Sequence, residues 1–245
     1  MLPFNTYGSH TNPPLIFLHG LLGFKEDWNE VISRLEDAFY CIAIDLPGHG
    51  QALSQIDPLS AIKHTIDQLG IDHPSAVGYS LGGRILMKLQ KQYPFYFDHL
   101  TFLSAHPGLM VQSEKDKKKQ EEEVWIERMQ TKGIEVFLKM WYDQPLFSSL
   151  HKKTELLASI IKTRSTQNLL SILTLYRQFR LSEQEHFRLL PKRTSFFYGE
   201  EDLSYKNLYM QKQWNIPLFS IADSSHAVHL ENPHACSSKI RELQS

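Results

Sequence analysis

The sequence predicts an α/β fold, with a mostly parallel β-sheet flanked by helices and a helical insertion, on three observations. In the first half of the chain, short apolar runs alternate with stretches of helical spacing, which is the pattern of βαβ units. From about residue 107 to about residue 190 the strand pattern stops and only helical spacing remains. Strand and helix patterns return near residue 195. A chain of 245 residues is long enough for one such domain with an insertion.

The first half contains four short apolar segments that end at turn signals, and we expect each to be a buried strand. These segments are 15–18, 40–44, 75–78 and 100–104. Helical spacing predicts helices between them, over 27–35, 58–69 and 81–93. Asp57 followed by Pro58 is a favourable start for the second of these helices, and Gly70 is a favourable residue just after its end.

The insertion and the last part of the chain complete the predicted order of elements. Within the insertion, helices are predicted over 113–130, 133–142, 152–162 and 166–180. Strands follow at 195–198 and 218–221, with a helix near 204–214 between them. A last helix begins at Pro233, with Asn232 as its N-cap. We therefore expect residues 1–106 and 191–245 to form the core and residues 107–190 to form a helical cap.

The composition and charge of the chain indicate what kind of partner and compartment to expect. The chain has 26 basic and 27 acidic residues, a net charge of −1, which gives no support to nucleic-acid binding but leaves room for a local basic pocket. Two cysteines, Cys41 and Cys236, suggest a reducing compartment. The N-terminus has no signal-peptide pattern, and no apolar run is long enough to span a bilayer. We expect a cytoplasmic protein without a membrane span; the oligomeric state stays open.

Ser80 is the predicted nucleophile. Residues Gly78 to Gly82 fit G-x-S-x-G at a predicted strand-to-helix junction, where a sharp turn lifts the serine hydroxyl above the sheet. The helix that begins at Leu81 points its N-terminus toward the hydroxyl and favours negative charge there. The alternative is a chance match, because glycine and serine are common near turns.

A reactive serine needs a base and a group that orients the base. Asp202 and His226 follow the predicted strands 195–198 and 218–221, so both are expected at the sheet edge that carries Ser80. The alternatives are two neighbouring acids and a second histidine: Glu200, Glu201 and His229. Because His229 leads into the final helix, we expect it on the surface.

The segment His19 to Gly23 follows the first buried strand and predicts a second part of the site. The backbone N–H groups of Leu21 and Leu81 can together form an oxyanion hole; the alternative is an ordinary glycine-rich turn. His49 is interpreted as a structural turn residue. The sequence contains no metal-binding motif, so no metal is expected.

These motifs, in this order, resemble the α/β-hydrolase superfamily from about residue 15 to the C-terminus: FLHG, DLPGHG, VGYSLGG, GEED and SSHAVHLENP. Four segments resemble, more narrowly, the 2-succinyl-6-hydroxy-2,4-cyclohexadiene-1-carboxylate (SHCHC) synthases of menaquinone biosynthesis: GYSLGGR, AHPGL, WYDQPLF and SSHAVHLENP. The chain departs from the superfamily at its start, where few residues precede the first strong strand.

The narrower resemblance implies a lyase that removes pyruvate from 2-succinyl-5-enolpyruvyl-6-hydroxy-3-cyclohexene-1-carboxylate. It implies a serine, activated by histidine, as the base, and it implies no cofactor. The alternatives are a serine hydrolase for small esters, thioesters or carbon–carbon bonds, and a non-catalytic ligand receptor on the same fold.

The substrate of that family is a small anion with three carboxylates, so the resemblance also implies a basic pocket. The matching positions are Arg84, Lys118 and Arg164, with Lys162 as the alternative to Arg164. Lys118 stands where the family usually has arginine, and its charge run makes a solvated lysine the alternative. Trp141 and Tyr142 match aromatic pocket positions of the family, with packing of the cap on the core as the alternative. Tyr79, beside the candidate nucleophile, is also expected to line the pocket.

Overall fold

The computed structural model describes residues 1–187, 194–210 and 216–244, and in them the predicted α/β class is confirmed. Seven strands form one sheet in the order β1-β3-β2-β4-β5-β6-β7, and only β1 runs antiparallel to its neighbour among the described strands. The strands are β1 Phe4–Tyr7, β2 Pro14–Leu18, β3 Tyr40–Ile44, β4 Ser75–Tyr79, β5 Leu100–Leu103, β6 Thr194–Gly199 and β7 Leu218–Ile221. A single strand, β1, thus precedes β2 in this fully described part of the chain.

The central strands are mostly apolar on both faces because both faces of the sheet are covered. In β2, Leu15 and Phe17 enter the hydrophobic core on one face, and Ile16 and Leu18 enter the core on the other. All four side chains are fully buried. Continuous apolar runs, rather than alternating ones, are what this arrangement requires.

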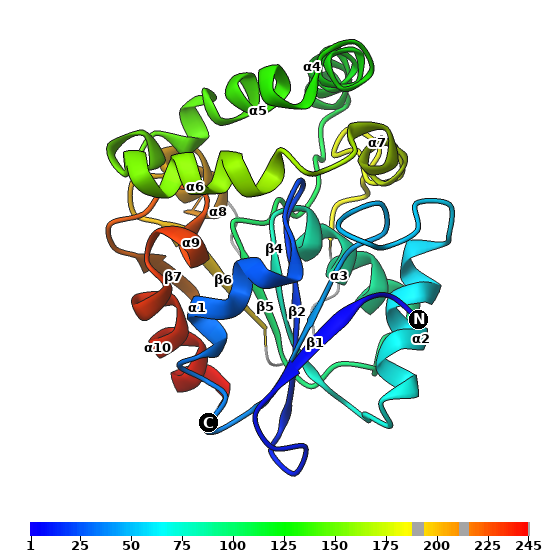
Figure 1. Cartoon of the computed structure of the whole chain (residues 1–245), viewed down its shortest axis with the longest axis vertical. Helices are drawn as coiled ribbons and strands as arrows, with labels where there is room; N and C mark the ends of the chain where they lie inside the picture. The colour runs from blue at the N-terminus through cyan, green and yellow to red at the C-terminus, as the bar shows by residue number, and fades with distance from the viewer. Residues whose placement is uncertain (188–193, 211–215, 245) are drawn as a thin grey trace.

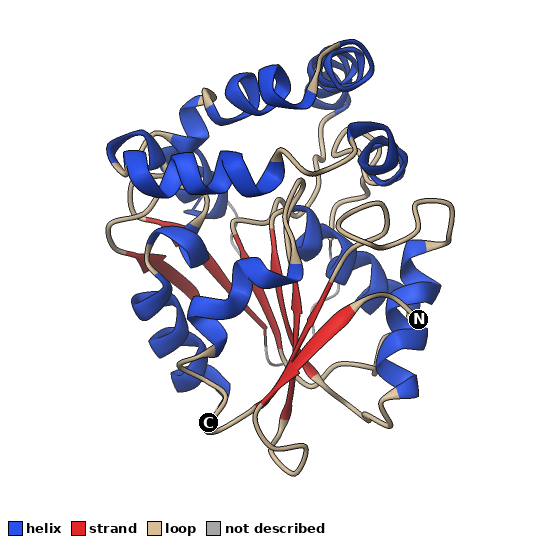
Figure 2. Cartoon of the chain, in the orientation of Figure 1, coloured by secondary structure: helices blue, strands red, loops and turns tan. Residues whose placement is uncertain are grey.

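Helices form a layer on each face of the sheet (Figures 1 and 2). One face is covered by η1 Lys25–Trp28, α1 Asn29–Ile32, α9 Val228–Glu231 and α10 Pro233–Gln244; the other is covered by α2 Pro58–Gln68, α3 Leu81–Gln92 and α8 Leu203–Met210. The predicted helix starts are confirmed, since the Asp57 side chain accepts the N–H of Ser60 and Asn232 accepts the N–H of Ala235. Residues 211–214 of the predicted helix 204–214 lie outside the described residues.

Four helices, which we call the cap helices, lie across the carboxyl edge of the sheet (Figure 1). They are α4 Gln112–Thr131, α5 Ile134–Tyr142, α6 Thr154–Arg164 and α7 Leu169–Gln178, with short 3₁₀ turns η2 Pro145–Phe147 and η3 Leu150–Lys152 between α5 and α6. The last cap helix begins three residues later than predicted because the Asn168 side chain accepts the N–H groups of Leu170 and Ser171 as an N-cap. The predicted insertion boundary at residue 190 lies outside the described residues.

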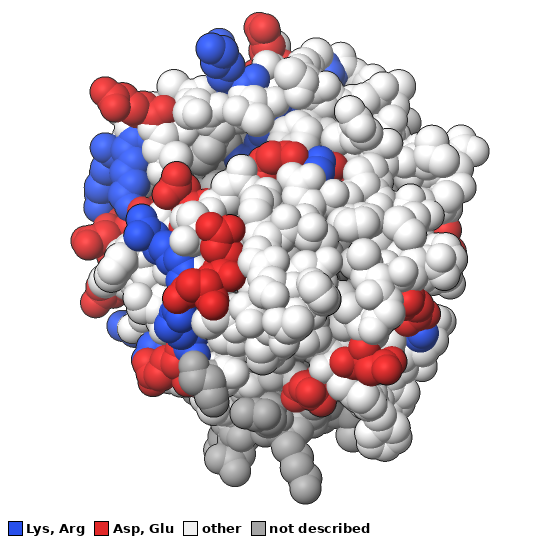
Figure 3. All heavy atoms as spheres, turned by 60° about the horizontal axis from the view of Figure 1, so that its bottom comes forward, with Lys and Arg blue, Asp and Glu red and all other residues white. Residues whose placement is uncertain are grey.

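The surface shown in Figure 3 carries basic and acidic side chains mixed together, with uncharged areas between them. This view shows the face away from the cap helices, and its described residues form no continuous basic stripe of the kind that binds a phosphate backbone. Within the described ranges, no helix combines the length and the apolar character that a bilayer crossing needs.

Candidate active site

The site lies where parallel strands end beneath the cap helices. Ser80 follows β4, Asp202 follows β6 by three residues, and His226 follows β7 by five. Strands β4, β5, β6 and β7 are parallel neighbours, so their carboxyl ends meet along the same edge of the sheet. This edge is where open α/β sheets bind their ligands.

Ser80 occupies a strained turn between β4 and α3. Its φ is +48° and its ψ is −106°, a region that L-residues rarely adopt. The glycines that follow permit close packing here, because a Cβ on Gly82 would lie 2.4 Å from the Leu18 carbonyl oxygen and one on Gly83 would lie 2.4 Å from the Ala105 Cβ. The G-x-S-x-G pattern is therefore needed for the backbone geometry itself.

Ser80, His226 and Asp202 form a hydrogen-bonded chain. The Ser80 Oγ lies 3.2 Å from the Nε2 of His226, and the Nδ1 of His226 lies 3.3 Å from the Oδ2 of Asp202. Asp202 is 3 % exposed and His226 is 4 % exposed. The neighbouring acid Glu201 points away and pairs with Lys152 at 2.7 Å on the surface. The geometry thus places a serine hydroxyl against an imidazole whose other nitrogen contacts a buried carboxylate, the arrangement that can activate a serine.

Two backbone N–H groups are available beside Ser80. The Gly20 carbonyl accepts from the Nδ1 of His19 at 2.7 Å and from the N–H of Gly23 at 3.1 Å. Because a peptide unit is planar, the N–H of Leu21 points away from these partners. The N–H of Leu81 opens α3, and within the described residues neither N–H group donates a hydrogen bond.

Buried histidines hold the backbone around this turn. His49 accepts the N–H of Leu22 at 3.1 Å, which is the structural role expected of it, and His19 accepts the N–H of Leu46 at 3.0 Å. Both rings are fully buried. Burial lowers the pKa of His19 and of His49 to about 3, so both act as neutral acceptors.

A cavity of about 240 Å³ opens between the Ser80 hydroxyl and the cap helices. It is lined by Ser80, His226 and all six residues implied to bind substrate: Tyr79, Arg84, Lys118, Trp141, Tyr142 and Arg164. The cap helices α4, α5 and α6 supply four of these side chains, and the core supplies Tyr79 and Arg84. The fold therefore brings together residues that lie far apart in the sequence.

The three cations of the cavity differ in how their charge is balanced. The Nη1 of Arg84 donates to the Phe179 carbonyl at 2.6 Å, and no carboxylate pairs with Arg84 among the described residues. Burial lowers the pKa of Arg84. Lys118 pairs with Glu121 at 3.0 Å and its side chain is 37 % exposed, so it both faces the cavity and reaches solvent. Arg84 thus differs from Lys118 and Arg164 in having no carboxylate in direct contact among the described residues.

Arg164 is the most deeply buried of the three cations. Its Nη2 pairs with Asp27 at 2.6 Å, its Nε donates to the Leu22 carbonyl, and its Nη1 is buried without a hydrogen-bond partner among the described residues. Although burial opposes the charge, Asp27 holds the pKa of Arg164 above its usual value. The alternative residue, Lys162, is exposed.

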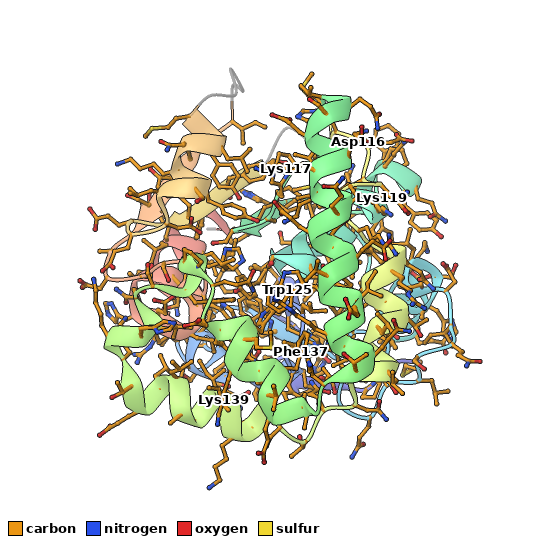
Figure 4. All side chains as sticks on the ribbon, turned by 90° about the horizontal axis from the view of Figure 1, so that it is seen from above. Asp116, Lys117, Lys119, Trp125, Phe137 and Lys139 are labelled. Atoms are coloured by element: carbon orange, nitrogen blue, oxygen red, sulfur yellow. The ribbon has the colours of Figure 1, made fainter. Side chains whose placement is uncertain are left out.

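The aromatic residues of the cap pack against one another as well as facing the cavity. Trp141 stacks on Phe137 at a ring distance of 5.9 Å and meets Trp125 edge-on at 4.9 Å. Figure 4, seen from above, labels Trp125 and Phe137 where α4 and α5 meet. Trp141 therefore combines cap packing with a place in the cavity wall.

Comparisons with known proteins show the family of this chain. The α/β hydrolase fold family model matches residues 13–233. A Haemophilus influenzae protein provisionally named SHCHC synthase is 35 % identical, over 92 % of this chain and 95 % of its own length. The chain belongs to the SHCHC synthase family of α/β hydrolases. The SHCHC synthase of Citrobacter koseri is 30 % identical over 92 % of this chain and 91 % of its own.

Solved structures show the same fold. The structure of MenH from S. aureus matches with a TM-score of 0.88 at 22 % identity, and the match covers 100 % of both chains. A thermophilic esterase from Thermogutta terrifontis matches with a TM-score of 0.80 at 17 % identity, over 99 % of this chain and 92 % of its own. A structure named MenH and one named an esterase thus share this fold, and site chemistry has to separate their activities.

The prediction that His229 lies on the surface is wrong for this family member. The ring is fully buried between Trp28 and Tyr79, with ring-centre distances of 4.5 Å and 4.3 Å. Burial lowers its pKa well below the usual value, so the ring is neutral. Its position leading into the final helix suggested exposure, but two aromatic neighbours from distant positions cover it.

The sequence interpretation also missed Glu231, whose side chain supports the backbone on both sides of the candidate base His226. Its carboxylate accepts the N–H of Ser225 at 3.1 Å and the N–H of Ala227 at 3.0 Å, the two residues that flank His226. The side chain is 7 % exposed. The one available signal is an acid five residues after the candidate base, directly before the helix-capping Asn232.

Glu122 is a second acid that the sequence interpretation did not single out. It lies in the cavity wall, and its carboxylate accepts the N–H groups of Leu181 and Ser182 at 2.6 Å and 3.3 Å. The charge run around it indicated only a solvated helix face. Its hydrogen bonds link α4 to the segment that follows α7.

Proposed function

We propose that this protein catalyses the elimination of pyruvate from 2-succinyl-5-enolpyruvyl-6-hydroxy-3-cyclohexene-1-carboxylate, giving SHCHC in menaquinone biosynthesis. In this reaction a carbon-bound proton is removed, the carbon–oxygen bond to the enolpyruvyl group breaks, and a ring double bond forms. The released enolpyruvate takes up a proton to become pyruvate. No acyl-enzyme is needed, in contrast to an esterase.

The observation that carries this proposal is the charge of the cavity beside Ser80. Arg84 faces that cavity without a carboxylate partner among the described residues, and Lys118 and Arg164 add two further cations. A pocket for a neutral ester gains nothing from three cations, whereas a small substrate with three carboxylates does. Arg164 keeps a buried Nη1 donor that a substrate carboxylate can use.

The roles within the reaction follow from the hydrogen-bonded chain. Ser80 removes the substrate proton while His226 takes the serine proton, and Asp202 keeps the imidazole oriented. The N–H groups of Leu21 and Leu81 stabilise the oxyanion charge that develops on the substrate. The chain itself supplies the groups for each of these steps.

The cap and the cellular location are part of the same proposal. We propose that residues 107–190 act as a cap that closes over the substrate, because the cap helices supply four of the cavity side chains. The free and buried thiols of Cys41 and Cys236 support a cytoplasmic location.

The direct test is release of pyruvate from the enolpyruvyl substrate, followed with lactate dehydrogenase and NADH, beside a panel of neutral esters. We expect pyruvate release by the wild type and a loss of orders of magnitude in kcat for Ser80→Ala, Asp202→Asn and His226→Ala, without additivity. Glu201→Gln should keep its activity. Wild-type turnover of the esters alone would overturn the proposal.

A second measurement separates elimination from acyl transfer. Rapid-quench mass spectrometry during turnover should find unmodified protein, because a serine that acts as a base forms no covalent bond to the substrate. A substrate-derived adduct on Ser80 that accumulates and is then hydrolysed would instead establish the serine hydrolase.

A further inference from the structure

The turn between α6 and α7 reaches down from the cap and holds the loop that carries Leu21. Gln167 in this turn donates from its Nε2 to the carbonyls of Leu22 and Gly23, at 3.3 Å and 2.9 Å. Its Oε1 accepts the N–H of Gly50 at 3.0 Å. The side chain is 7 % exposed and uses both its donors and its acceptor. One glutamine thus joins the loop after β2 to the loop after β3.

Leu22 is held from two sides and needs that support. Its φ is +65°, which is strained for a branched L-residue. The core holds its N–H through His49, while the cap holds its carbonyl through Gln167 and Arg164. Without the partners from the cap, the strained conformation loses the contacts that maintain it.

The orientation of the Leu21 N–H depends on this conformation. The preceding carbonyl, that of Gly20, is held by the N–H of Gly23 together with the Nδ1 of His19, and Gly23 is the second residue whose carbonyl Gln167 binds. A change in the Leu22–Gly23 backbone therefore removes one of the two contacts that orient the peptide unit presenting the Leu21 N–H to the cavity. Helix α7 packs closely against the loop after β3, since a Cβ on Gly48 would lie 2.4 Å from the Ser171 carbonyl oxygen.

We propose that Gln167 is a positioning residue through which the docked cap sets the oxyanion donor of Leu21. It acts through the loop backbone and does not line the cavity. This inference rests on the proposed function in one respect, because it treats the Leu21 N–H as the group that stabilises developing negative charge.

The test compares two variants of Gln167 with a matched control. Gln167→Glu keeps the size and the acceptor for Gly50 but places a carboxylate oxygen against the two carbonyls, and Gln167→Ala removes every contact. The control is Gln90→Ala, a buried glutamine on α3 whose Nε2 donates to the Pro94 carbonyl, away from the loop. Each protein is measured by steady-state pyruvate release and by hydrogen–deuterium exchange of the peptide over residues 19–25.

We expect both Gln167 variants to lower kcat by about tenfold to a hundredfold, with KM changed by less than about threefold. Amide exchange over residues 19–25 should accelerate in both variants and stay unchanged in Gln90→Ala. Wild-type kcat together with wild-type exchange in Gln167→Glu would overturn the inference. A rise in KM at constant kcat would also overturn it, since it would make Gln167 a binding residue.

Failure of the proposed function gives a different result. A wild type that releases no pyruvate but hydrolyses an ester would end the lyase proposal, while leaving the Gln167 inference testable on ester turnover and on amide exchange. Accelerated exchange with unchanged turnover of every substrate would remove the oxyanion role and reject the inference.

Discussion

Replacement of Glu231 by glutamine should weaken both the fold and the reaction. The carboxylate offers one oxygen to the N–H of Ser225 and the other to the N–H of Ala227. A glutamine offers one oxygen and one NH₂ group, so one buried backbone N–H would face a donor. The loss of a hydrogen bond to a charged group costs about 1.5–3 kcal/mol, and we expect the free energy of unfolding to fall by that amount.

The effect on turnover follows from the place of His226 between those two amides. A displacement of about 1 Å at a catalytic group can cost about a hundredfold in rate. We expect Glu231→Gln to lower kcat by about tenfold to a hundredfold while KM stays within about threefold. Urea unfolding followed by tryptophan fluorescence gives the stability, and pyruvate release gives the kinetic constants.

The matched control is Glu201→Gln, which removes a carboxylate whose surface ion pair with Lys152 contributes at most about 1 kcal/mol. This variant should retain the kcat and nearly all of the stability of the wild type. The reasoning fails if Glu231→Gln keeps its wild-type kcat. A stability loss without a kinetic effect would give Glu231 a purely structural role.

Three further predictions concern charge. Arg84→Ala should lower kcat/KM for the tricarboxylate by about ten- to a hundredfold and leave the hydrolysis of a neutral ester unchanged, with Arg84→Lys recovering part of the loss. Lys118→Ala should weaken substrate binding, whereas Lys118→Arg should be tolerated because the cavity accepts a cation there. The free energy of unfolding, measured with urea, should fall by about 2 kcal/mol for each of His19 and His49 between pH 7 and pH 5. The reason is that these histidines take up protons near pH 6.5 in the unfolded chain, whereas the buried rings do not.

The outcomes that would contradict these predictions are specific. Equal losses on anionic and neutral substrates would assign Arg84 to bracing the cap through Phe179 rather than to binding a carboxylate. Two silent changes at Lys118 would make it a solvated lysine. A depressed pKa means that stability is complete above about pH 6.5 and declines as the pH falls toward 3. His49→Asn should therefore reduce the slope of the free energy of unfolding against pH in this window. An unchanged slope would exclude the buried neutral histidine as the cause of the pH dependence.

Much of the architecture could be predicted from local sequence patterns. The central strands are buried on both faces, so Leu15 to Leu18 form an unbroken apolar run that few other structures produce. The helix caps at Asp57 and Asn232 are interactions within a few residues, so the order of residue types indicates them directly. Ser80 lies in the same category, because its strained turn requires the glycines beside it.

The order of strands also determined where the candidate triad meets. Parallel strands end at one edge, so residues that follow β4, β6 and β7 had to be neighbours once the sheet was recognised. The sequence alone leaves Glu201 as an alternative to Asp202. The structure separates them by direction, since Asp202 contacts His226 and Glu201 contacts Lys152.

Tertiary structure alone decided which polar side chains support the site. Gln167, Glu231 and Glu122 each bind backbone groups, and a backbone N–H or carbonyl has no residue identity for a sequence pattern to carry. Lys118 lies in a charge run typical of a solvated helix, and only the way α4 lies across the sheet turns it toward the cavity.

The burial of His229 was also decided by the tertiary structure. Its position leading into the final helix favoured exposure, and its burial results from Trp28 and Tyr79, which the fold brings to it from distant parts of the chain. The sequence by itself determined the sheet, the strained serine turn and the chemical types of the candidate triad, because these depend on periodicity, local sterics and strand order. The packing of the cap on the core decided the charge, the walls and the backbone support of the cavity, because those interactions join residues that no local pattern relates.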